Sequence, residues 1–360
     1  MTVIKEYRVI GLMSGTSLDG LDIAYCNFKL ENGRWSYQIL ETDSINYTSD
    51  FKAQLKNAIY LQSHALIALH NTFGSWMGTQ VADFIKKHEL VVDFIASHGH
   101  TVLHQPDIGI TYQIGSGQHL ANSSGQKVIC DFRTNDVYYG GQGAPLVPIG
   151  DELLFSEYDY CLNLGGISNI SPKQNNIRIA DDNAPVNMLL NHICNSINLD
   201  YDDEGKLGRS GQLNTALLQH LNSLDYYSQS IPKSLGYEWF ASQILPILDL
   251  HPDTTENLLH TSVHHIAQQL AKAIHSHKLS NATILATGGG AKNIYFIEVL
   301  RQKLGDQFTI VSPEEELIDH KESLIFAFMG VLKERDEINC LSAVTGARKD
   351  SSSGVIFNPA

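Results

Sequence analysis

The feature that most constrains the fold is a pattern of strands and turns that occurs twice in the chain. In its first occurrence, residues 7–13 are apolar and β-prone, and a turn of Gly, Ser and Thr follows. Residues 21–28 then alternate apolar and polar side chains, which is the period of a half-buried strand. Asn32 and Gly33 form a hairpin signal that leads into a third strand at 35–40. The chain is therefore predicted to open with a three-stranded antiparallel meander.

The same order returns in the second half of the chain. Residues 160–164 and 167–171 are predicted strands joined by a Gly-Gly turn, and a third strand at 177–180 follows another turn. The two occurrences share a pattern of elements but not residue identities, which indicates an internal structural duplication. Helical and strand segments follow each meander, among them a helix over 63–87 with apolar residues three and four apart. We therefore predict an α/β fold with duplicated mixed sheets and flanking helices.

Gly and Pro cluster in residues 140–148, GGQGAPLVP, where neither the strand period nor the helix period continues. This segment is the predicted boundary between an N-terminal lobe, residues 1–148, and a C-terminal lobe, residues 149–338. A short tail over 339–360 remains, and we expect it to pack back on the N-terminal lobe.

Acidic residues outnumber basic ones, 39 to 25, for a formal net charge of -14. Nucleic acid and anionic membranes bind basic surfaces, so we expect neither as a partner. No segment approaches the roughly 18 apolar residues of a membrane span, and the first apolar stretch is too short for a signal peptide. The five cysteines are scattered and form no C-x-x-C pair, which favours free thiols in a reducing compartment. We expect a cytoplasmic protein.

The turn of the first meander reads GTSLDGLD over residues 15–22. Glycine lets backbone N–H groups approach an anion, and hydroxyl groups add donors, so the turn is a candidate phosphate cradle. Carboxylates beside a phosphate suit Mg²⁺, which is commonly held by one or two carboxylates and by phosphate oxygens. An ordinary hairpin turn is the alternative. The predicted nucleotide contacts are Gly15, Thr16, Ser17, Leu18, Asp19, Gly20, Leu21 and Asp22, with Asp19 and Asp22 as magnesium candidates.

Two further glycine-rich turns lie in the second half. Asn163, Gly165 and Gly166 belong to the turn of the second meander, at the place that matches the first cradle. A triphosphate clasped by both lobes needs one such turn from each. The third turn follows a predicted strand and opens a helix, where a ribose or a flat ring can approach closely. The turn is neither a Walker A loop nor a dinucleotide fingerprint, so neither P-loop nor Rossmann binding is implied. We expect it on the adenosine side, and a tight strand-to-helix turn is the alternative. Its predicted contacts are Gly288, Gly289, Gly290 and Asn293.

Two polar segments follow predicted strands of the first half. Residues 97–104, SHGHTVLH, contain H-x-H-x3-H, a spacing that could seed a zinc site. A substrate-binding loop is the other interpretation, because open α/β sheets place ligands at strand ends. Arg133 follows the strand at 127–130, and its guanidinium is a bidentate fork for a carboxylate. A structural ion pair is the alternative in an acidic chain.

Asp181 and Asp182 follow the third strand of the second meander. Carboxylates at a strand end can act as a general base and as a contact to a metal or a sugar. A cap for the helix that begins near Pro185 is the alternative. Strand alternation points the two side chains in opposite directions, so only one of them can face a given site.

Together these segments resemble the anhydro-N-acetylmuramic acid kinase family over nearly the whole chain. The motifs that carry the resemblance are MSGTSLDGLD (13–22), SHGHTVLHQP (97–106), DFRTNDVYYGGQGAPLVP (131–148), NLGGISNI (163–170), ADDNAPVN (180–187), YDDEGKLGRSG (201–211), PKSLGYE (232–238), ATGGGAKN (286–293) and NCLSAVTGA (339–347).

The resemblance implies the fold of the hexokinase, Hsp70 and actin superfamily, an actin-like ATPase with two lobes around a cleft, each built on a ribonuclease-H-like sheet. It implies MgATP as the donor and 1,6-anhydro-N-acetylmuramic acid as the sugar substrate, in peptidoglycan recycling. Water would open the anhydro bridge at C1 while the γ-phosphoryl group goes to O6, giving N-acetylmuramate 6-phosphate. It also implies a homodimer.

The family motifs assign roles to individual residues. The predicted sugar contacts are His98, Thr101, Arg133, Gln142 and Gly143. Arg133 is expected to bind the lactyl carboxylate. The motif match favours Asp182 over Asp181 as the general base for water. Glu322 lies in a Lys-Glu-Ser segment similar to the family's Lys-Glu-Ala, and we expect it to help hold that water.

The chain departs from the family pattern at two places. Many members read D-T-G-P-G-N where this chain reads Asp182-Asn183-Ala184-Pro185-Val186-Asn187, and His100 stands where Gln is more usual. Two other classes of protein remain as alternatives. A metal-dependent hydrolase would use His98, His100, His104 and Asp131, and would bind zinc without turning over ATP. A non-enzymatic ATP switch would hydrolyse ATP slowly without any sugar.

Overall fold

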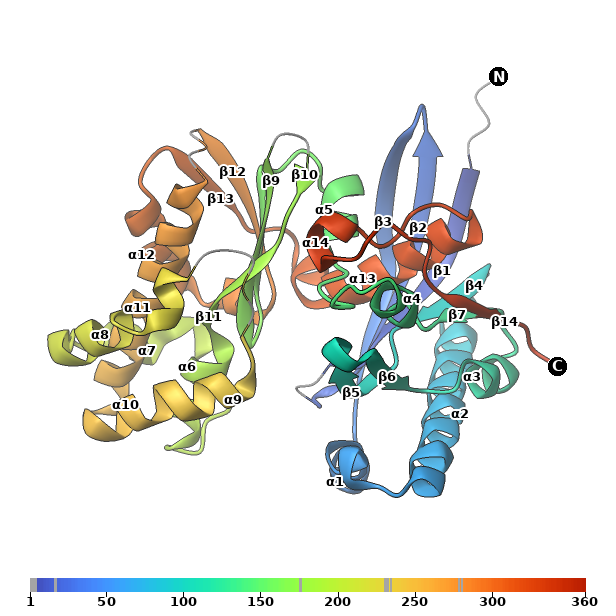
Figure 1. Ribbon diagram of the computed structural model, residues 1–360, viewed down its shortest axis with the longest axis horizontal. Coiled ribbons are helices and arrows are strands. Elements are labelled where there is room, and N and C mark those ends of the chain that lie inside the picture. The colour runs from blue at the N-terminus through green and yellow to red at the C-terminus, as the bar shows by residue number, and fades with distance from the viewer. Residues whose placement is uncertain are drawn as a thin grey trace. The chain divides into compact units, whose positions relative to one another are not determined.

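The computed structural model describes residues 5–15, 18–174, 177–229, 233, 235–277, 279 and 281–360. The chain forms two compact units (Figure 1). Unit 1 comprises Met1–Phe155 and His320–Ala360, and unit 2 comprises Ser156–Asp319. This division differs from the predicted lobes. The chain passes from unit 1 to unit 2 after residue 155 instead of residue 148, and residues 320–338 belong to unit 1.

Unit 1 is built on a six-stranded sheet. Strand β1 is antiparallel to β2, as the first meander requires, and its other edge pairs in parallel with β4. The sheet order is β14-β7-β4-β1-β2-β3, and a separate hairpin pairs β5 with β6. The strands are β1 (Lys5–Met13), β2 (Gly20–Glu31), β3 (Arg34–Asn46), β4 (Phe94–Ser97), β5 (His100–Gln105), β6 (Ile110–Ile114), β7 (Val128–Cys130) and β14 (Val355–Phe357).

The helices of unit 1 cover this sheet. The predicted helix over 63–87 is confirmed as α2, and its apolar residues join the core that contains Ile10 and Ile95. The α-helices are α1 (Ser49–Lys56), α2 (Ser63–Lys87), α3 (Gly117–Ser124), α4 (Thr134–Tyr138), α5 (Pro148–Leu153), α13 (Glu315–Glu334, which unit 1 enters at His320) and α14 (Ser342–Thr345).

Helix α13 explains why unit 1 contains a late part of the chain. A Cβ on Gly11 of β1 would collide with the carbonyl oxygen of Ser323, so the glycine lets this helix lie directly on the strand. Farther along, Phe328 packs against Phe28 with ring centroids 5.3 Å apart. Strand β14 extends the same sheet by pairing with β7.

Unit 2 repeats the sheet of unit 1. Its order β10-β9-β8-β12-β13 corresponds strand for strand to β3-β2-β1-β4-β7, and β8 is antiparallel to β9 and parallel to β12. This correspondence confirms the predicted duplication and the α/β fold class. The strands are β8 (Tyr160–Leu164), β9 (Ile167–Gln174), β10 (Ile177–Arg178), β11 (Asp181–Pro185), β12 (Ala282–Thr287) and β13 (Phe308–Val311).

The predicted third strand at 177–180 is wrong in its extent. Strand β10 ends at Arg178, and a separate strand, β11, begins at Asp181. Strand β9 is long enough to pair with both, with β10 at its far end and with β11 nearer its start. Asp181 and Asp182 therefore begin a strand instead of ending one.

The helices of unit 2 enclose an apolar core with the sheet. Helix α11 contributes a long buried face that includes Leu259, Val263 and Leu270. The α-helices are α6 (Asn187–Asn195), α7 (Lys206–Ser210), α8 (Thr215–Asn222), α9 (Tyr237–Trp239), α10 (Leu245–Leu250), α11 (Thr255–Ser276) and α12 (Ile294–Leu304).

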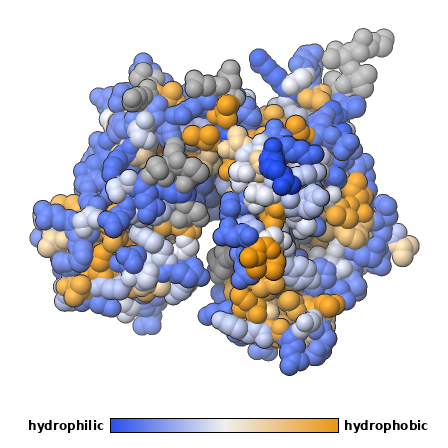
Figure 2. All heavy atoms as spheres, in the orientation of Figure 1, coloured by the Kyte–Doolittle hydropathy of each residue, from blue (hydrophilic) through white to orange (hydrophobic). Residues whose placement is uncertain are grey.

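Hydrophilic side chains cover most of the face drawn in Figure 2, and apolar side chains occur there in separate patches. Among the described residues, no helix has both the length and the apolar character needed to cross a membrane.

Candidate active site

The first predicted cradle lies between β1 and β2. Thr16 and Ser17 lie outside the described residues. On one side of the turn, the Ser14 hydroxyl accepts a hydrogen bond of 2.7 Å from the Tyr47 hydroxyl and lies 3.2 Å from His100 Nδ1. Gly20 must be glycine because a Cβ there would lie 2.5 Å from the Ile45 carbonyl oxygen of β3. The contact with His100 ties the turn to the start of the hairpin strand β5, where the SHGH segment ends.

The two magnesium candidates lie in different environments. Asp19 is exposed, whereas Asp22 is partly buried on β2 and accepts a hydrogen bond of 2.6 Å from Ser44 Oγ. Burial raises the pKa of Glu322 on α13, and the negative charge of Asp22 raises it further while Arg133 opposes the shift. Asp22 is therefore the carboxylate that lies near Glu322.

The residues near Asp22 fit a magnesium ion whose coordination the phosphates of a nucleotide would complete. No group of three or more His, Cys, Asp or Glu residues that could hold a metal is found in the described ranges. A pair of carboxylates supplies one or two oxygen ligands, and phosphate oxygens usually supply others at kinase sites. Asp22 and Glu322 are consistent with that donor set.

Arg133 is held in place by His98. The His98 ring lies with Nδ1 2.9 Å from the Gly99 carbonyl oxygen and with Nε2 3.0 Å from Arg133 Nε and 2.9 Å from its Nη2. Burial and the nearby guanidinium lower the pKa of His98 well below its usual value, so the ring is neutral. Nδ1 therefore donates to the carbonyl, and Nε2 accepts from the guanidinium. His98 orients Arg133, a role that the motif alone did not indicate.

The remaining predicted sugar contacts lie around this pair. Arg133 Nη1 donates to the Gly143 carbonyl oxygen. Gln142 is exposed, and its backbone N–H donates to the Thr345 carbonyl oxygen. Thr101 on β5 accepts a hydrogen bond of 3.2 Å from Gln113. Burial lowers the pKa of Arg133 to about 10, partly offset by Glu322, so the guanidinium remains charged.

A buried carboxylate that the sequence did not single out supports the Gly143 loop. Asp136 is 1% exposed and accepts hydrogen bonds from the Gly143 N–H at 2.8 Å and from Thr345 Oγ1 at 2.7 Å. Cys340 Sγ lies 3.2 Å from the same carboxylate. Thr345 and Cys340 belong to the motif NCLSAVTGA, which was the available signal for this support.

The three histidines of the alternative zinc site have separate partners. His98 binds Arg133, His100 lies beside Ser14, and His104 Nδ1 lies 3.1 Å from Thr111 Oγ1. Rings that are held by different partners do not converge on one ion. The arrangement favours a polar substrate loop over a zinc hydrolase.

The second glycine turn is open to a ligand. The carbonyl oxygens of Gly165 and Gly166 accept hydrogen bonds from the N–H groups that begin helix α6, at Val186, Asn187 and Met188. A Cβ on Gly166 would have no atom within 4 Å, and one on Gly165 would have none closer than 3.6 Å. The space above this turn is therefore free for an anion.

Asp182 is held at both carboxylate oxygens. Oδ1 accepts a hydrogen bond of 3.2 Å from Asn169 Nδ2, and Oδ2 accepts one of 3.0 Å from the Leu235 N–H. The Tyr226 hydroxyl donates to the Asp182 carbonyl oxygen at 2.8 Å. These contacts fix the orientation of a partly buried carboxylate. Asn169 and Tyr226 were not predicted as site residues, although Asn169 lies in the NLGGISNI motif.

The strand register places Asp182 in a row of polar residues across the sheet. Asp182 of β11 pairs with Asn169 of β9, which pairs with Asn163 of β8, which in turn pairs with Thr287 of β12. Side chains directly opposite one another in neighbouring strands lie on the same face. The predicted base, the second glycine turn and the third glycine turn therefore lie at one edge of the sheet of unit 2.

The three glycines after β12 have different reasons to be glycine. Gly288 has φ +80° and would place a Cβ 2.6 Å from Asn163 Oδ1, and Gly290 would place one 2.9 Å from Leu164. Both let this turn pack against the end of β8. Gly289 is exposed, and a Cβ there would meet only Asn187 Nδ2 at 3.3 Å. Gly289 is the one of the three that is open to a ligand.

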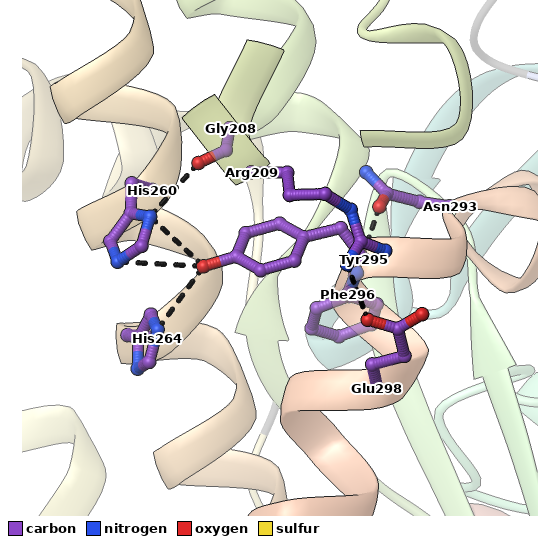
Figure 3. A network of polar contacts seen from close by, with 8 residues as sticks. All are labelled: Gly208, Arg209, His260, His264, Asn293, Tyr295, Phe296 and Glu298. Atoms are coloured by element: carbon purple, nitrogen blue, oxygen red, sulfur yellow. Dashed lines mark hydrogen bonds and ion pairs between the residues drawn. The ribbon is translucent and has the colours of Figure 1, made fainter. Parts of the chain in front are cut away.

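Asn293 has a structural role beside this turn. Its Oδ1 accepts a hydrogen bond of 2.9 Å from the Phe296 N–H and so caps α12 (Figure 3). The predicted adenosine contact would therefore have to use the other face of the amide.

A polar network anchors α12 on the other side (Figure 3). The Tyr295 hydroxyl lies 2.9 Å from His260 Nδ1 and 3.2 Å from His264 Nε2, both on α11. Arg209 lies over the Tyr295 ring, 5.1 Å from its centroid, and forms an ion pair of 2.7 Å with Glu298. The motif YDDEGKLGRSG thus holds the helix that follows the third glycine turn.

The departures from the family pattern near Asp182 fit the backbone. Val186 has φ -108°, and neither Ala184 nor Val186 lies in the left-handed region that favours glycine. Both side chains are fully buried in the core of unit 2. The larger residues therefore add core packing without strain.

The same strand order in two sheets of one chain, with a glycine turn after the first strand of each, is the actin-like ATPase fold that sugar kinases use. Within this class, the sequence profile of the anhydro-N-acetylmuramic acid kinase family matches residues 7–359. The chain is 29% identical to an anhydro-N-acetylmuramic acid kinase of Bacillus thuringiensis over 98% of this chain and 99% of that one. It is 31% identical to an anhydro-N-acetylmuramic acid kinase of Francisella tularensis over 96% of this chain and 97% of that one. The chain belongs to the anhydro-N-acetylmuramic acid kinase family.

Proposed function

We propose that this protein is an ATP-dependent kinase that opens 1,6-anhydro-N-acetylmuramic acid with water and phosphorylates O6, giving N-acetylmuramate 6-phosphate and ADP. The observation that carries the proposal is the row from Asp182 through Asn169 and Asn163 to Thr287, which joins a fixed carboxylate to two glycine turns. Membership of the kinase family supplies the substrate class.

Asp182 is the proposed general base. It takes the proton of a water molecule that attacks C1, the bond from C1 to the bridging oxygen breaks, and that oxygen, now O6, receives the γ-phosphoryl group. Because the phosphoryl group accepts the leaving oxygen, no second protein acid is needed for it. The hydrogen bonds from Asn169 and Leu235 hold the Asp182 carboxylate in one orientation while it takes the proton.

The nucleotide is proposed to bind at the glycine turns. Gly165, Gly166 and Gly289 have open space for phosphate or ribose. The segment between β1 and β2 is the corresponding part of unit 1. Mg²⁺ would be held by Asp22, with Glu322 nearby, and would neutralise charge on the phosphates. Asp19 is a weaker candidate because it is exposed.

Arg133 is proposed to bind the lactyl carboxylate. His98 takes two of the five N–H groups of the guanidinium and the Gly143 carbonyl oxygen takes a third, which leaves two for a ligand. Thr101, Gln142 and Gly143 lie nearby as further sugar contacts. We also propose that the enzyme is a homodimer, as the resemblance implies, and that it works in the cytoplasm, as its scattered cysteines favour.

The deciding experiment measures ADP release with purified protein, MgATP and either no sugar or the 1,6-anhydro-sugar. Release that requires the sugar, together with a phosphorylated product of matching mass, supports the proposal. Slow release that ignores the sugar would indicate an ATP switch. No release, with tight zinc binding, would indicate the hydrolase alternative.

A further inference from the structure

A cavity of about 310 Å³ lies within unit 2, on the side of β11 away from Asp182. Alternate residues of the strand, Asp181 and Asn183, line it, and helix α11 closes the opposite wall with Gln269 and Lys272. Lys233 also lines the cavity. The volume is at the lower end of the range for small-molecule sites.

The charge of this cavity is locally positive in an acidic protein. Lys233 Nζ donates to the Tyr226 carbonyl oxygen at 3.2 Å, and Lys272 Nζ donates to the neighbouring Tyr227 carbonyl oxygen at 3.0 Å. Each ammonium group has three donors, so both have N–H groups left for a ligand. Among the described residues that line the cavity, the only carboxylate is that of Asp181. Burial lowers the pKa of Lys233, and the charge of Lys272 lowers it further while Asp181 opposes the shift.

A buried acceptor in the same wall has no donor. Asn183 is 3% exposed, and its Nδ2 donates to Asp181 Oδ2 at 2.8 Å, which fixes the orientation of the amide. Within the described part of the chain, no hydrogen-bond donor reaches Asn183 Oδ1. A buried polar atom without a partner is unfavourable, so it points to a group that is missing from the cavity. Asn183 is also a departure from the family motif, which more often has Thr there.

We propose that this cavity binds a small organic anion whose charged group pairs with Lys233 and Lys272 and whose hydroxyl or ammonium hydrogen is accepted by Asn183 Oδ1. A phosphate monoester or a carboxylate with a neighbouring hydroxyl has this chemistry. The site is distinct from the glycine turns, which lie at the edge of the sheet with Asp182.

An occupant would act on Asp182 through one covalent neighbour and through one hydrogen-bonded segment. Asn183 follows Asp182 in β11. The backbone of Lys233 accepts a hydrogen bond of 3.2 Å from the Asp182 N–H, and Leu235 donates to the Asp182 carboxylate. The anion is therefore an effector of turnover, a consequence that rests on the proposed function of Asp182.

Binding is tested first, by calorimetry on the full chain without nucleotide or sugar. The probes are glycerol 3-phosphate, inorganic phosphate and glycerol. Glycerol 3-phosphate should bind about tenfold more tightly than phosphate, and glycerol should show no saturable binding. Lys272→Met should weaken glycerol 3-phosphate about tenfold, whereas Lys303→Met, an exposed lysine of α12 outside the cavity, should not change it. Asn183→Ser should remove the preference over phosphate.

Equal binding by the Lys272→Met and Lys303→Met variants overturns the proposal. So does binding that is lost in Gly165→Val and kept in Lys272→Met, because the anion would then lie at the glycine turn. A carboxylate probe, glycerate, tests which anionic group is preferred. These measurements do not depend on turnover, so they stand even if the kinase assay fails.

The effector role is tested by turnover at saturating ATP and sugar. Glycerol 3-phosphate should change kcat of the wild-type protein at least about twofold and leave kcat of Lys272→Met unchanged, because the variant lacks the anion contact. An equal response of the two proteins would mean that the phosphate acts elsewhere and would overturn the effector role.

Discussion

Asp181 and Asp182 are neighbours in the chain, yet they contact opposite sides of strand β11. Asp182 receives hydrogen bonds from Asn169 and Leu235, whereas Asp181 lines the cavity against α11 and receives one from Asn183. Burial raises the pKa of Asp181 to about 6. The two carboxylates can therefore be separated by experiment, although their sequence context is the same.

Asp182→Asn should lower kcat by at least the ~10²–10⁴ typical of the loss of a general base, because the amide cannot take a proton from water. Asp181→Asn should keep kcat within about threefold, since its side chain lies on the other face of the strand. Single-turnover assays on both variants provide the measurement, and ATP binding serves as the control for folding. An inactive Asp181→Asn beside an active Asp182→Asn would reverse the assignment.

Asp181→Asn should also change how stability depends on pH. The folded pKa of about 6 exceeds the ordinary value of 3.8 for an aspartate, so the folded state holds the proton more tightly than the unfolded state. The free energy of unfolding of the wild type should therefore fall, relative to the variant, as pH rises from about 4 to about 6. At pH 7 the variant should be more stable by about 1–3 kcal/mol, and at pH 4 the advantage should disappear. Urea unfolding at a series of pH values measures this, and a constant difference would contradict it.

Arg133→Ala should weaken binding of the lactyl-bearing sugar by about 1.5–3 kcal/mol, the value of a charged bidentate contact. An anhydro-sugar without the lactyl group should lose much less. His98→Leu should reproduce part of this selective loss, because the guanidinium loses its neutral acceptor, and His98→Gln should restore it. Steady-state KM values for the two sugars provide the comparison. Equal losses on both sugars would make Arg133 a structural residue.

Gly165→Val should raise KM for ATP about tenfold or more and leave KM for the sugar nearly unchanged. The protein itself accommodates the new side chain, because φ is not in the left-handed region and an added Cβ meets nothing closer than 3.6 Å. Gly288→Val is the matched contrast. It should lower the melting temperature, because its φ of +80° is strained and its Cβ would lie 2.6 Å from Asn163. Unchanged ATP kinetics in Gly165→Val would remove this turn from the nucleotide site.

Lys321→Met should destabilise the protein by about 3–5 kcal/mol, because it removes the cation that is paired with a buried carboxylate. Lys321 and Asp151 are 2.8 Å apart, and their side chains are 5% and 3% exposed. The double variant with Asp151→Leu should recover much of the loss. Lys29→Met, which breaks an exposed pair with Glu6, should cost no more than about 1 kcal/mol. Similar losses in the two single variants would contradict the importance of burial.

The sequence predicted the parts of the fold that depend on local pattern. Alternating side chains and glycine turns located β1, β2 and β8, and the duplicated order of strands confirmed the fold class. The extent of the strand at 177–180 was wrong because pairing along β9, not local propensity, decides where β10 ends and β11 begins. Strand ends depend on partners that a local pattern does not contain.

Several contacts of the candidate site could not be predicted from the sequence. Asp136 supports the Gly143 loop through Cys340 and Thr345, which lie 204 and 209 residues away in the chain. The proximity of Asp22 to Glu322 depends on α13 crossing β1 at Gly11. Residues at these separations share no periodicity, so only the folded chain shows that they meet.

The split composition of unit 1 has a consequence for the order of folding. Residues 156–319 form unit 2 without interruption, whereas the sheet that begins with β1 needs α13 on its face and β14 at its edge, both from residues after 319. Chains usually fold from the N-terminal domain onward as they leave the ribosome. Here the order is reversed. Residues 156–319 can complete the core of unit 2 before residues 320–360, which unit 1 needs, have been made. Once residue 319 has left the ribosome, unit 2 can be complete while the sheet of unit 1 still lacks α13 and β14.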